Sequence, residues 1–373
     1  MKEISVVICQ ASVRHPRQTE ASILPFDDGR LLLAYTDYYG GKPKDGAPAR
    51  IMGKWSRDEG ESWSPPFVLQ ENIGKLNVMS ASLLRLPSGR VLFAFHRKDS
   101  QGKDAPADLQ AMLRWSDDEG RTWSAPAPIT KGQAYWCGTN DRLLRLSTGR
   151  LLWPVKRMLC QEPDALMAWI SDDDGATWRK GAGELPQPEG KTYEEPALVE
   201  LADGAVAMFI RTETKACRYQ FIHVARSADG GETWTLHSEG GPGSTFSPCL
   251  AKRLPGSTDL LLIWNNHMMR TSLTAAISRD NGDTWKNLRL LEEEEDWPLS
   301  RSHTYPSLAF LNGNAHITYW ESHKHPATAN MFHLVYRRLP IAWFYESRPR
   351  RAAVYDPARN LLSARSEYDG EGG

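Results

Sequence analysis

Tyrosine, glutamate and arginine side chains stand at the polar ends of short apolar runs in this 373-residue chain. Glu195 precedes the run PALVEL, Arg211 follows AMFI, and Tyr305 precedes PSLAFL. A carboxylate close to a phenol can accept its proton, and a guanidinium can bind a carboxylate through two hydrogen bonds. If folding brings these groups together, they predict a small-ligand site that combines proton transfer with anion binding.

The elements that would position these side chains repeat along the chain. Five segments follow the pattern S-x-D-x-G-x-[ST]-W, at intervals of 51 to 60 residues, and they begin at Ser56, Ser116, Ser171, Ser227 and Ser278. In such a box the aspartate can accept backbone N–H groups across a turn, and the glycine supplies a positive φ. The tryptophan can then pack flat between neighbouring sheets.

A second element repeats in phase with the boxes. It consists of two apolar strands around a glycine turn, and it occurs six times, at Gly29, Gly89, Gly149, Gly204, Gly256 and Gly313. A third strand enters each box and a shorter fourth strand leaves it. This pattern predicts an all-β chain, a six-bladed β-propeller with four-stranded antiparallel blades, over residues 1–346.

The two ends of the chain complete this prediction. The sixth unit lacks a clear fourth strand, and we expect the N-terminal strand of residues 3–8 to fill the vacant edge. Residues 347–373 are charged and end in glycines, and we expect them to form a flexible tail outside the site.

Polar residues gather at one end of the predicted blades, where the first strand of each hairpin begins and the second ends. If these strands only packed against one another, apolar or small residues would be expected there. We therefore expect the following residues to converge on one concavity that binds a small ligand: Arg17, Glu20, Asp37, Ser80, His96, Arg97, Asn140, Arg157, Glu195, Arg211, Arg270, Tyr305 and Glu321.

The five boxes resemble the Asp-boxes, or BNR repeats, of the sialidase (neuraminidase) superfamily, whose members are six-bladed propellers. The resemblance implies a tyrosine nucleophile activated by a glutamate, an aspartate that acts as acid and base, and three arginines that clamp the substrate carboxylate. EEPALVELADGAVAMFIR resembles a superfamily motif in which Glu195 would be the activating glutamate and Arg211 a clamp arginine. HTYPSLAFLNG resembles the motif that holds the nucleophile, which would be Tyr305.

The other roles follow from weaker matches. Arg270, in WNNHMMRTSLTAA, would be a second clamp arginine, and Glu321 would support the first one. That first arginine would be Arg17, although Arg14 competes for the role. The acid/base aspartate would be Asp45 in the loop TDYYGGKPKDG, with Asp37 as the alternative. The remaining pocket-end residues would bind substrate.

The resemblance implies an exo-glycoside hydrolase that releases a terminal acidic sugar, sialic acid in the first place, with retention of configuration. Alternatives are a lyase or hydrolase acting on another acidic sugar such as a uronate, and a propeller that binds carbohydrate without cleaving it. We expect no cofactor and no metal. The five cysteines are scattered, and the pair His323 and His325 has no evident third ligand.

Composition narrows the class of partner. The formal charge is −1, from 45 Lys and Arg against 46 Asp and Glu, so no global field favours nucleic acid or an anionic membrane. No apolar run reaches the ~18–20 residues of a membrane span. The N-terminus is typical of a short strand and not of a signal peptide, so we expect a cytoplasmic protein; a secreted protein with its signal removed would look the same. The oligomeric state stays open.

Overall fold

Antiparallel strands make up almost all the regular structure in the computed structural model of this chain. The structure describes residues 3–102, 106–159, 162–292, 301–323 and 330–346, together with the backbone of two strands at 352–356 and 361–365. The expectation of an all-β chain is confirmed. Among the described residues, no helix has the length and apolar character needed to cross a membrane.

Each glycine turn joins two strands of a hairpin, as the sequence predicted. At the first turn, Gly29 N donates to Phe26 O (3.0 Å) and Phe26 N donates to Arg30 O (2.8 Å). The same pair of bonds recurs around Gly89, Gly149 and Gly204. The hairpins extend into meanders, which we number as repeats one to six in chain order.

The first three repeats have the following strands. Repeat one consists of β2 (Arg17–Pro25), β3 (Leu31–Tyr38), β4 (Ala49–Ser56) and β5 (Phe67–Gln70). Repeat two consists of β6 (Asn77–Arg85), β7 (Val91–Ser100), β8 (Asp108–Ser116) and β9 (Ala127–Pro128). Repeat three consists of β10 (Tyr135–Cys137), β11 (Leu144–Arg145), β12 (Leu151–Met158), β13 (Ala165–Ser171), β14 (Arg179–Lys180) and β15 (Leu185–Pro186).

The last three repeats follow the same order. Repeat four consists of β16 (Thr192–Glu200), β17 (Val206–Glu213), β19 (His223–Ser227) and β20 (Thr235–Ser238), and β18 (Gln220–Phe221) pairs with β21 (Gly243–Ser244) beside it. Repeat five consists of β22 (Leu250–Arg253), β23 (Leu260–Asn265), β24 (Leu273–Ser278) and β25 (Lys286–Leu290). Repeat six consists of β26 (Ser302–Leu311), β27 (Asn314–His323) and β28 (Met331–Pro340), and a short 3-10 helix, Ile341–Tyr345, follows it.

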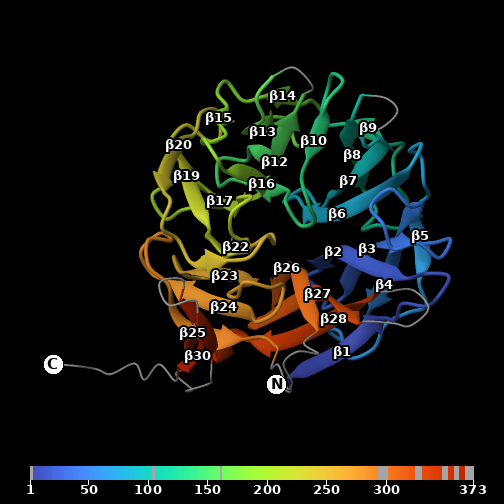
Figure 1. Ribbon diagram of the computed structural model, residues 1–373. Helices are drawn as coiled ribbons and strands as arrows, with labels where there is room; N and C mark the ends of the chain where they lie inside the picture. The colour runs from blue at the N-terminus through green and yellow to red at the C-terminus, as the bar shows by residue number, and fades with distance from the viewer. Residues whose placement is uncertain are drawn as a thin grey trace.

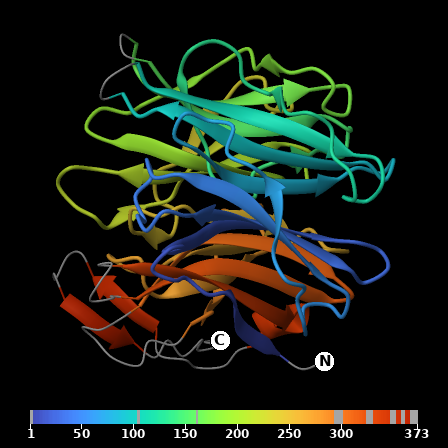
Figure 2. The ribbon, with the colours of Figure 1, turned by 90° about the vertical axis from the view of Figure 1, so that its right-hand side faces the viewer.

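The repeats lie side by side around a common centre, with β2, β6, β16, β22 and β26 nearest to it (Figure 1). Turned by 90°, the neighbouring sheets are seen stacked face to face (Figure 2). After repeat six, β29 (Ala352–Asp356) and β30 (Leu361–Arg365) pair as an antiparallel hairpin. The rest of the expected tail, residues 347–373, lies outside the described residues.

The apolar core lies between repeats and not within them. In β3, Leu32 and Ala34 pack against repeat two, whereas Leu31 and Leu33 pack against repeat six. Successive side chains of a strand point to opposite faces, so a sheet with a neighbour on each face needs an unbroken apolar run such as LLLAY. Six buried clusters in the described part of the chain each join two neighbouring repeats, and one of them joins repeat six to repeat one.

The boxes have the expected turn geometry. In the first box, Ser62 N donates to Asp58 Oδ1 (2.8 Å), and Gly60 N donates to Ser56 Oγ (2.8 Å). Gly60 has φ +88°, and a Cβ at this position would collide with the hydroxyl of Tyr336. The aspartate carboxylate bonds its turn in the same way in the other four boxes.

The N-terminal strand pairs with the last repeat, as predicted. Residues of β1 (Ile4–Cys9) lie antiparallel to β28, with Ile4 opposite Arg338 and Val7 opposite Val335. β1 therefore gives repeat six its outer strand and covers an edge that would otherwise be unpaired. β28 also has one parallel contact with repeat one, Arg17 opposite Phe332.

Deleting residues 3–8 should lower the melting temperature by several degrees and promote aggregation, because it exposes the edge of β28. Thermal unfolding and light scattering would measure both effects. Val6→Thr is the matched control, since Val6 is 42% exposed and threonine keeps the backbone pairing. A deletion variant that stays soluble and melts like the intact chain would contradict the role given to β1.

Candidate active site

Four of the strands nearest the centre begin with the same irregularity. In β2, β6, β16 and β26 the register with the next strand shifts, at Thr19/Ser22, Met79/Ser82, Glu194/Ala197 and Thr304/Ser307. Each of these bulges contains one residue other than glycine with a left-handed φ, and they are Glu20 (54°), Ser80 (62°), Glu195 (37°) and Tyr305 (58°). Such conformations are uncommon and cluster at functional sites.

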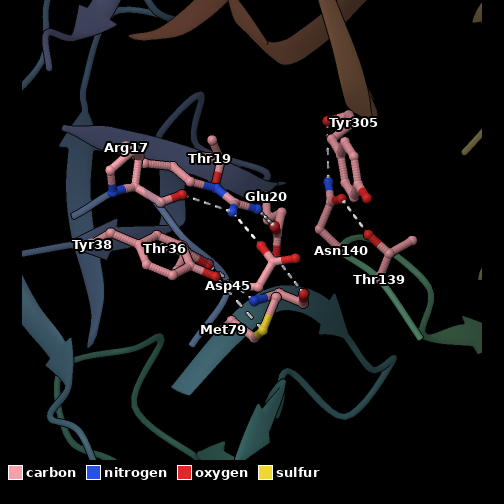
Figure 3. Close-up of polar contacts among 12 residues, drawn as sticks. Arg17, Thr19, Glu20, Thr36, Tyr38, Asp45, Met79, Thr139, Asn140 and Tyr305 are labelled. Carbon is pink, nitrogen blue, oxygen red and sulfur yellow. Dashed lines mark hydrogen bonds and ion pairs between the residues drawn. The ribbon is translucent and has the colours of Figure 1, made fainter. Parts of the chain in front are cut away.

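Side chains from repeat three hold two of these bulges. Asn140 Nδ2 donates to the carbonyls of Ala21 (2.7 Å) and Pro306 (3.2 Å), each next to a bulged residue. Leu308 N donates to the carboxylate of the neighbouring Asp141 (2.9 Å). Figure 3 shows Asn140 directly beside Tyr305. The strained starts of β2 and β26 are therefore fixed by hydrogen bonds from one turn.

A tyrosine and a glutamate form the first half of the site. Tyr305 Oη donates to Glu195 Oε1 (2.8 Å), and the other oxygen of Glu195 accepts from Arg211 Nη1. Arg211 also pairs with Glu213 through Nη2. Burial and the charge of Glu195 raise the pKa of Tyr305 above its ordinary value, although Arg270 and Arg211 oppose this. The phenol is therefore protonated at neutral pH, with its proton directed at a carboxylate.

An arginine with two carboxylates forms the second half. Arg17 Nη2 donates to Glu20 Oε1 (2.6 Å), and Arg17 Nη1 pairs with Asp45. Ser80 Oγ donates to the other oxygen of Glu20 (2.5 Å). The guanidinium also lies over the ring of Tyr38, 4.5 Å from its centroid. Figure 3 shows Arg17, Glu20 and Asp45 gathered on one side of the site, with Tyr305 on the other.

Asp45 differs from the other acids because 60% of its side chain is exposed. Partial burial of its loop would raise the pKa of Asp45, but Arg17, Lys98 and Arg270 outweigh this and hold the pKa below its ordinary value. Asn77 Nδ2 fixes the backbone of this loop by donating to Asp45 O and Ala47 O, both at 2.8 Å. The carboxylate is thus ionised and accessible while its backbone is held.

A cavity of about 110 Å³ lies between the two halves. Its polar lining comes from four bulged residues, from Arg17 and Asp45, and from repeats two and three: Arg17, Glu20, Asp45, Ser80, His96, Lys98, Tyr135, Cys137, Glu195 and Tyr305. Arg270 stands beside this cavity, with its guanidinium carbon 5.6 Å from the centroid of the Tyr305 ring. Among the described residues Arg270 has no ion-pair partner, and its Nε donates to Phe246 O (3.1 Å).

Other residues expected at the site lie elsewhere. Asp37 is buried and accepts from Gln18 Nε2 (2.6 Å), His15 Nδ1 (2.9 Å) and Arg50 Nε (3.3 Å). It does not line the cavity, in contrast to Asp45. Arg14, the alternative to Arg17, is exposed on the surface.

Three further expected residues pair with partners away from the cavity. Arg97 pairs with Asp99 (2.9 Å). Arg157 pairs with Glu184 (2.7 Å) and lines a separate pocket near Trp136 and Trp169. Glu321, expected beside the first arginine, accepts instead from His303 Nε2 (2.9 Å), which lies opposite it on β26.

Sequence reasoning missed Lys98, Tyr135 and Cys137. In a strand, residues two apart point to the same face. If His96 lines the cavity, Lys98 is therefore expected to line it too, and Arg97 is not. Tyr135 and Cys137 belong to the three-residue strand β10, whose weak sequence pattern offered no comparable signal.

The sequence and the fold both have known relatives. The BNR repeat-like domain matches residues 29–317, most of the chain. The sialidase of Paraclostridium sordellii is 27% identical over 239 residues, which cover 58% of this chain and 56% of that protein. The chain spans about half the length of the first curated relatives it matches, which are sialidases.

The chain belongs to the BNR repeat-like family of the sialidase superfamily. Among solved structures, a Dyadobacter fermentans protein of unknown function has a TM-score of 0.72 and 22% identity to this superfamily member, covering 90% of this chain and 97% of that one. Trypanosoma rangeli sialidase, solved as a covalent intermediate with 2,3-difluorosialic acid, has a TM-score of 0.71 and 16% identity, covering 92% and 59%. At these identities the solved structures support the fold alone.

Asn140→Ala should lower the free energy of unfolding by about 1–3 kcal/mol, because it leaves buried carbonyls at two bulges without a donor. Urea unfolding would measure the change. Thr139→Val is the matched control: it removes only the bond from Thr139 Oγ1 to Asn140 Oδ1 (3.1 Å) and should cost less. An Asn140→Ala variant no less stable than Thr139→Val would show that the bulges do not depend on this amide.

Proposed function

We propose that this protein is a sialidase-type exo-glycoside hydrolase that releases a terminal acidic sugar, sialic acid in the first place, with retention of configuration. The observation that carries the proposal is the hydrogen bond from Tyr305 Oη to Glu195 Oε1 (2.8 Å), beside a cavity that Asp45 and Arg17 also line. A nucleophile, its base and a separate acid therefore share one small space. The sialidase relatives support the same reaction class.

The residues suggest a double displacement. Tyr305 Oη attacks the anomeric carbon and gives its proton to Glu195. Asp45, which is ionised at rest, first takes up a proton from solvent and then gives it to the leaving oxygen. The glycosyl–tyrosine bond then replaces the glycosidic bond. In the second half, Asp45 takes a proton from water, the water oxygen attacks the same carbon, and Glu195 returns the proton to Tyr305. Two inversions give net retention.

A tyrosine suits this substrate class for an electrostatic reason. A sugar with a carboxylate on its anomeric carbon would repel a carboxylate nucleophile, whereas a neutral phenol approaches it without repulsion. The raised pKa of Tyr305 keeps the phenol neutral until Glu195 removes its proton during attack.

We assign the substrate carboxylate to the arginines around the cavity. Arg270 is the most available of them, because the described residues give it no ion pair. Arg17 and Arg211 are already neutralised by carboxylates, so their contribution requires that the ligand share or replace those partners. We also infer that repeats one to six are the six blades of a propeller, with β1 as the outer strand of the last blade.

Tyr305→Phe should keep the fold and substrate binding but reduce turnover by a factor of 10³ or more, on the order expected when a covalent nucleophile is lost. Turnover of a fluorogenic sialoside and circular dichroism would measure the two effects. Glu195→Gln should give a milder loss, and a fluorinated sialosyl donor should label Tyr305 in mass spectrometry. A Tyr305→Phe variant with near-normal turnover would exclude the tyrosyl intermediate.

Asp45→Asn should slow hydrolysis of alkyl glycosides by roughly 10²–10⁴-fold and of nitrophenyl glycosides far less, because only the poor leaving group needs a proton. Asp37→Asn is the matched control, since Asp37 lies away from the cavity and should leave this ratio unchanged. Steady-state kinetics of both variants on the two substrates would show which aspartate is the acid. The opposite pattern would transfer the acid role to Asp37.

A further inference from the structure

Lys98 is a buried lysine with no close carboxylate partner among the described residues. Burial lowers its pKa, and the charges of Asp45 and Glu20 oppose this. Lys98 lies on β7, its side chain lines the cavity beside Tyr305, and only 2% of the residue is exposed. Among the described residues, no carboxylate oxygen lies within ion-pair distance of its ammonium group. Its hydrogen bond is to a neutral acceptor, Asp45 O, at a long 3.3 Å.

A second buried lysine shows how the charge of a buried ammonium group is usually balanced. Lys156, on β12, is as deeply buried, but Glu194 lies 2.5 Å from its ammonium nitrogen and Asp164 lies 3.0 Å away. Removing an ammonium from water is costly unless an anion or several acceptors replace the lost hydration. Lys156 meets this requirement within the protein, and Lys98 does not.

Two other side chains of the lining can donate hydrogen bonds into the cavity, which Glu20, Asp45 and Glu195 line as well. Arg17 lines it from β2, and His96 lines it from β7 with both ring nitrogens buried. Burial lowers the pKa of His96 to about 3, so the ring is neutral at neutral pH and its N–H is a donor without charge. Arg17 and Lys98 are therefore the two cations that line the cavity, since Arg211 and Arg270 stand outside its lining.

The size of the cavity limits what it can accept. A volume of about 110 Å³ accommodates a small substituent such as a carboxylate. A carboxylate fits, is acceptor-only, and matches the two cations of the lining. Its position next to Tyr305 is also where a group attached to the reacting carbon would lie.

We propose that Lys98 is a substrate-binding residue that, together with the arginines around the cavity, holds the carboxylate of the acidic sugar. This inference rests on the proposed function and adds to it a specificity determinant from repeat two. The ligand carboxylate would form an ion pair with Lys98, which has no such partner within the described protein. It would also bind Arg17, which already pairs with Asp45. The site would then discriminate an acidic sugar from its neutral analogue by this lysine.

The test is a ligand-observed NMR titration with two matched pairs: sialic acid and its methyl ester, and glucuronic acid and its methyl ester. Lys98→Met keeps most of the side-chain volume and removes the charge. It should weaken binding of the preferred acid by roughly tenfold to a hundredfold and leave the ester unchanged, as expected for a lost charge-assisted bond. Lys54→Met is the control, since Lys54 also donates to a backbone carbonyl (Ile8 O, 2.7 Å) but does not line the cavity.

The outcomes separate this inference from the proposed function. Equal losses for acid and ester would mean that Lys98 only holds the Asp45 loop, and no loss would remove it from the site; either result overturns the inference while the Tyr305 experiments still test the hydrolase. A Lys98-dependent preference for glucuronic acid would uphold the inference and overturn sialic acid as the substrate. If the intact protein binds neither acid more tightly than its ester, the inference fails.

Discussion

The candidate site depends on a bulge at the start of four central strands. In a regular strand, side chains point alternately to the two faces of the sheet, toward the neighbouring repeats. A residue with a left-handed φ leaves this alternation and directs its side chain out of the strand end, and Glu20, Ser80, Glu195 and Tyr305 all line one cavity. Each such residue costs on the order of 1–3 kcal/mol, so the surrounding contacts must hold it in place.

Those contacts come from other repeats. Asn140 and Asp141 hold backbone groups of repeats one and six, and the side chain of Ser22 accepts from Leu83 N (3.0 Å) in repeat two. The reactive groups are therefore positioned by bonds that cross between repeats. The same arrangement pairs carboxylates with arginines. Glu195 and Glu213 neutralise Arg211, while Glu20 and Asp45 neutralise Arg17. A ligand that enters this site must compete with the protein's own carboxylates.

The sequence predicted the repeated architecture well because its signals are local. A glycine turn between apolar runs and an aspartate in a tight turn need no information from the rest of the chain. It also placed Tyr305 and Glu195 at one end of the strands, and the structure brings them into contact. The sequence did not show to which face of the strand each side chain points near an irregular strand end. His96 and Arg97 were both expected at the site, whereas alternation places Lys98 there, and Arg97 pairs with Asp99.

Loops posed a different difficulty. Asp37 and Asp45 flank one loop, and the sequence favoured Asp45 as the acid but left Asp37 as an alternative. Asp37 is the last-but-one residue of β3 and bonds to Gln18 and Arg50. Asn77 and Lys98, both from the next repeat, donate to the Asp45 backbone at the cavity. Such a contact between distant segments leaves no local signal in the sequence.

The pairing of β1 with β28 also bears on how the chain folds. Ile4 and Arg338 are partners although more than 300 residues separate them, and the cluster that joins repeat six to repeat one needs both segments. During synthesis the first strand therefore emerges long before its partner exists. Because contacts between distant segments form only after a large loss of chain entropy, this pairing should be among the last steps of folding, and its apolar face stays exposed until then.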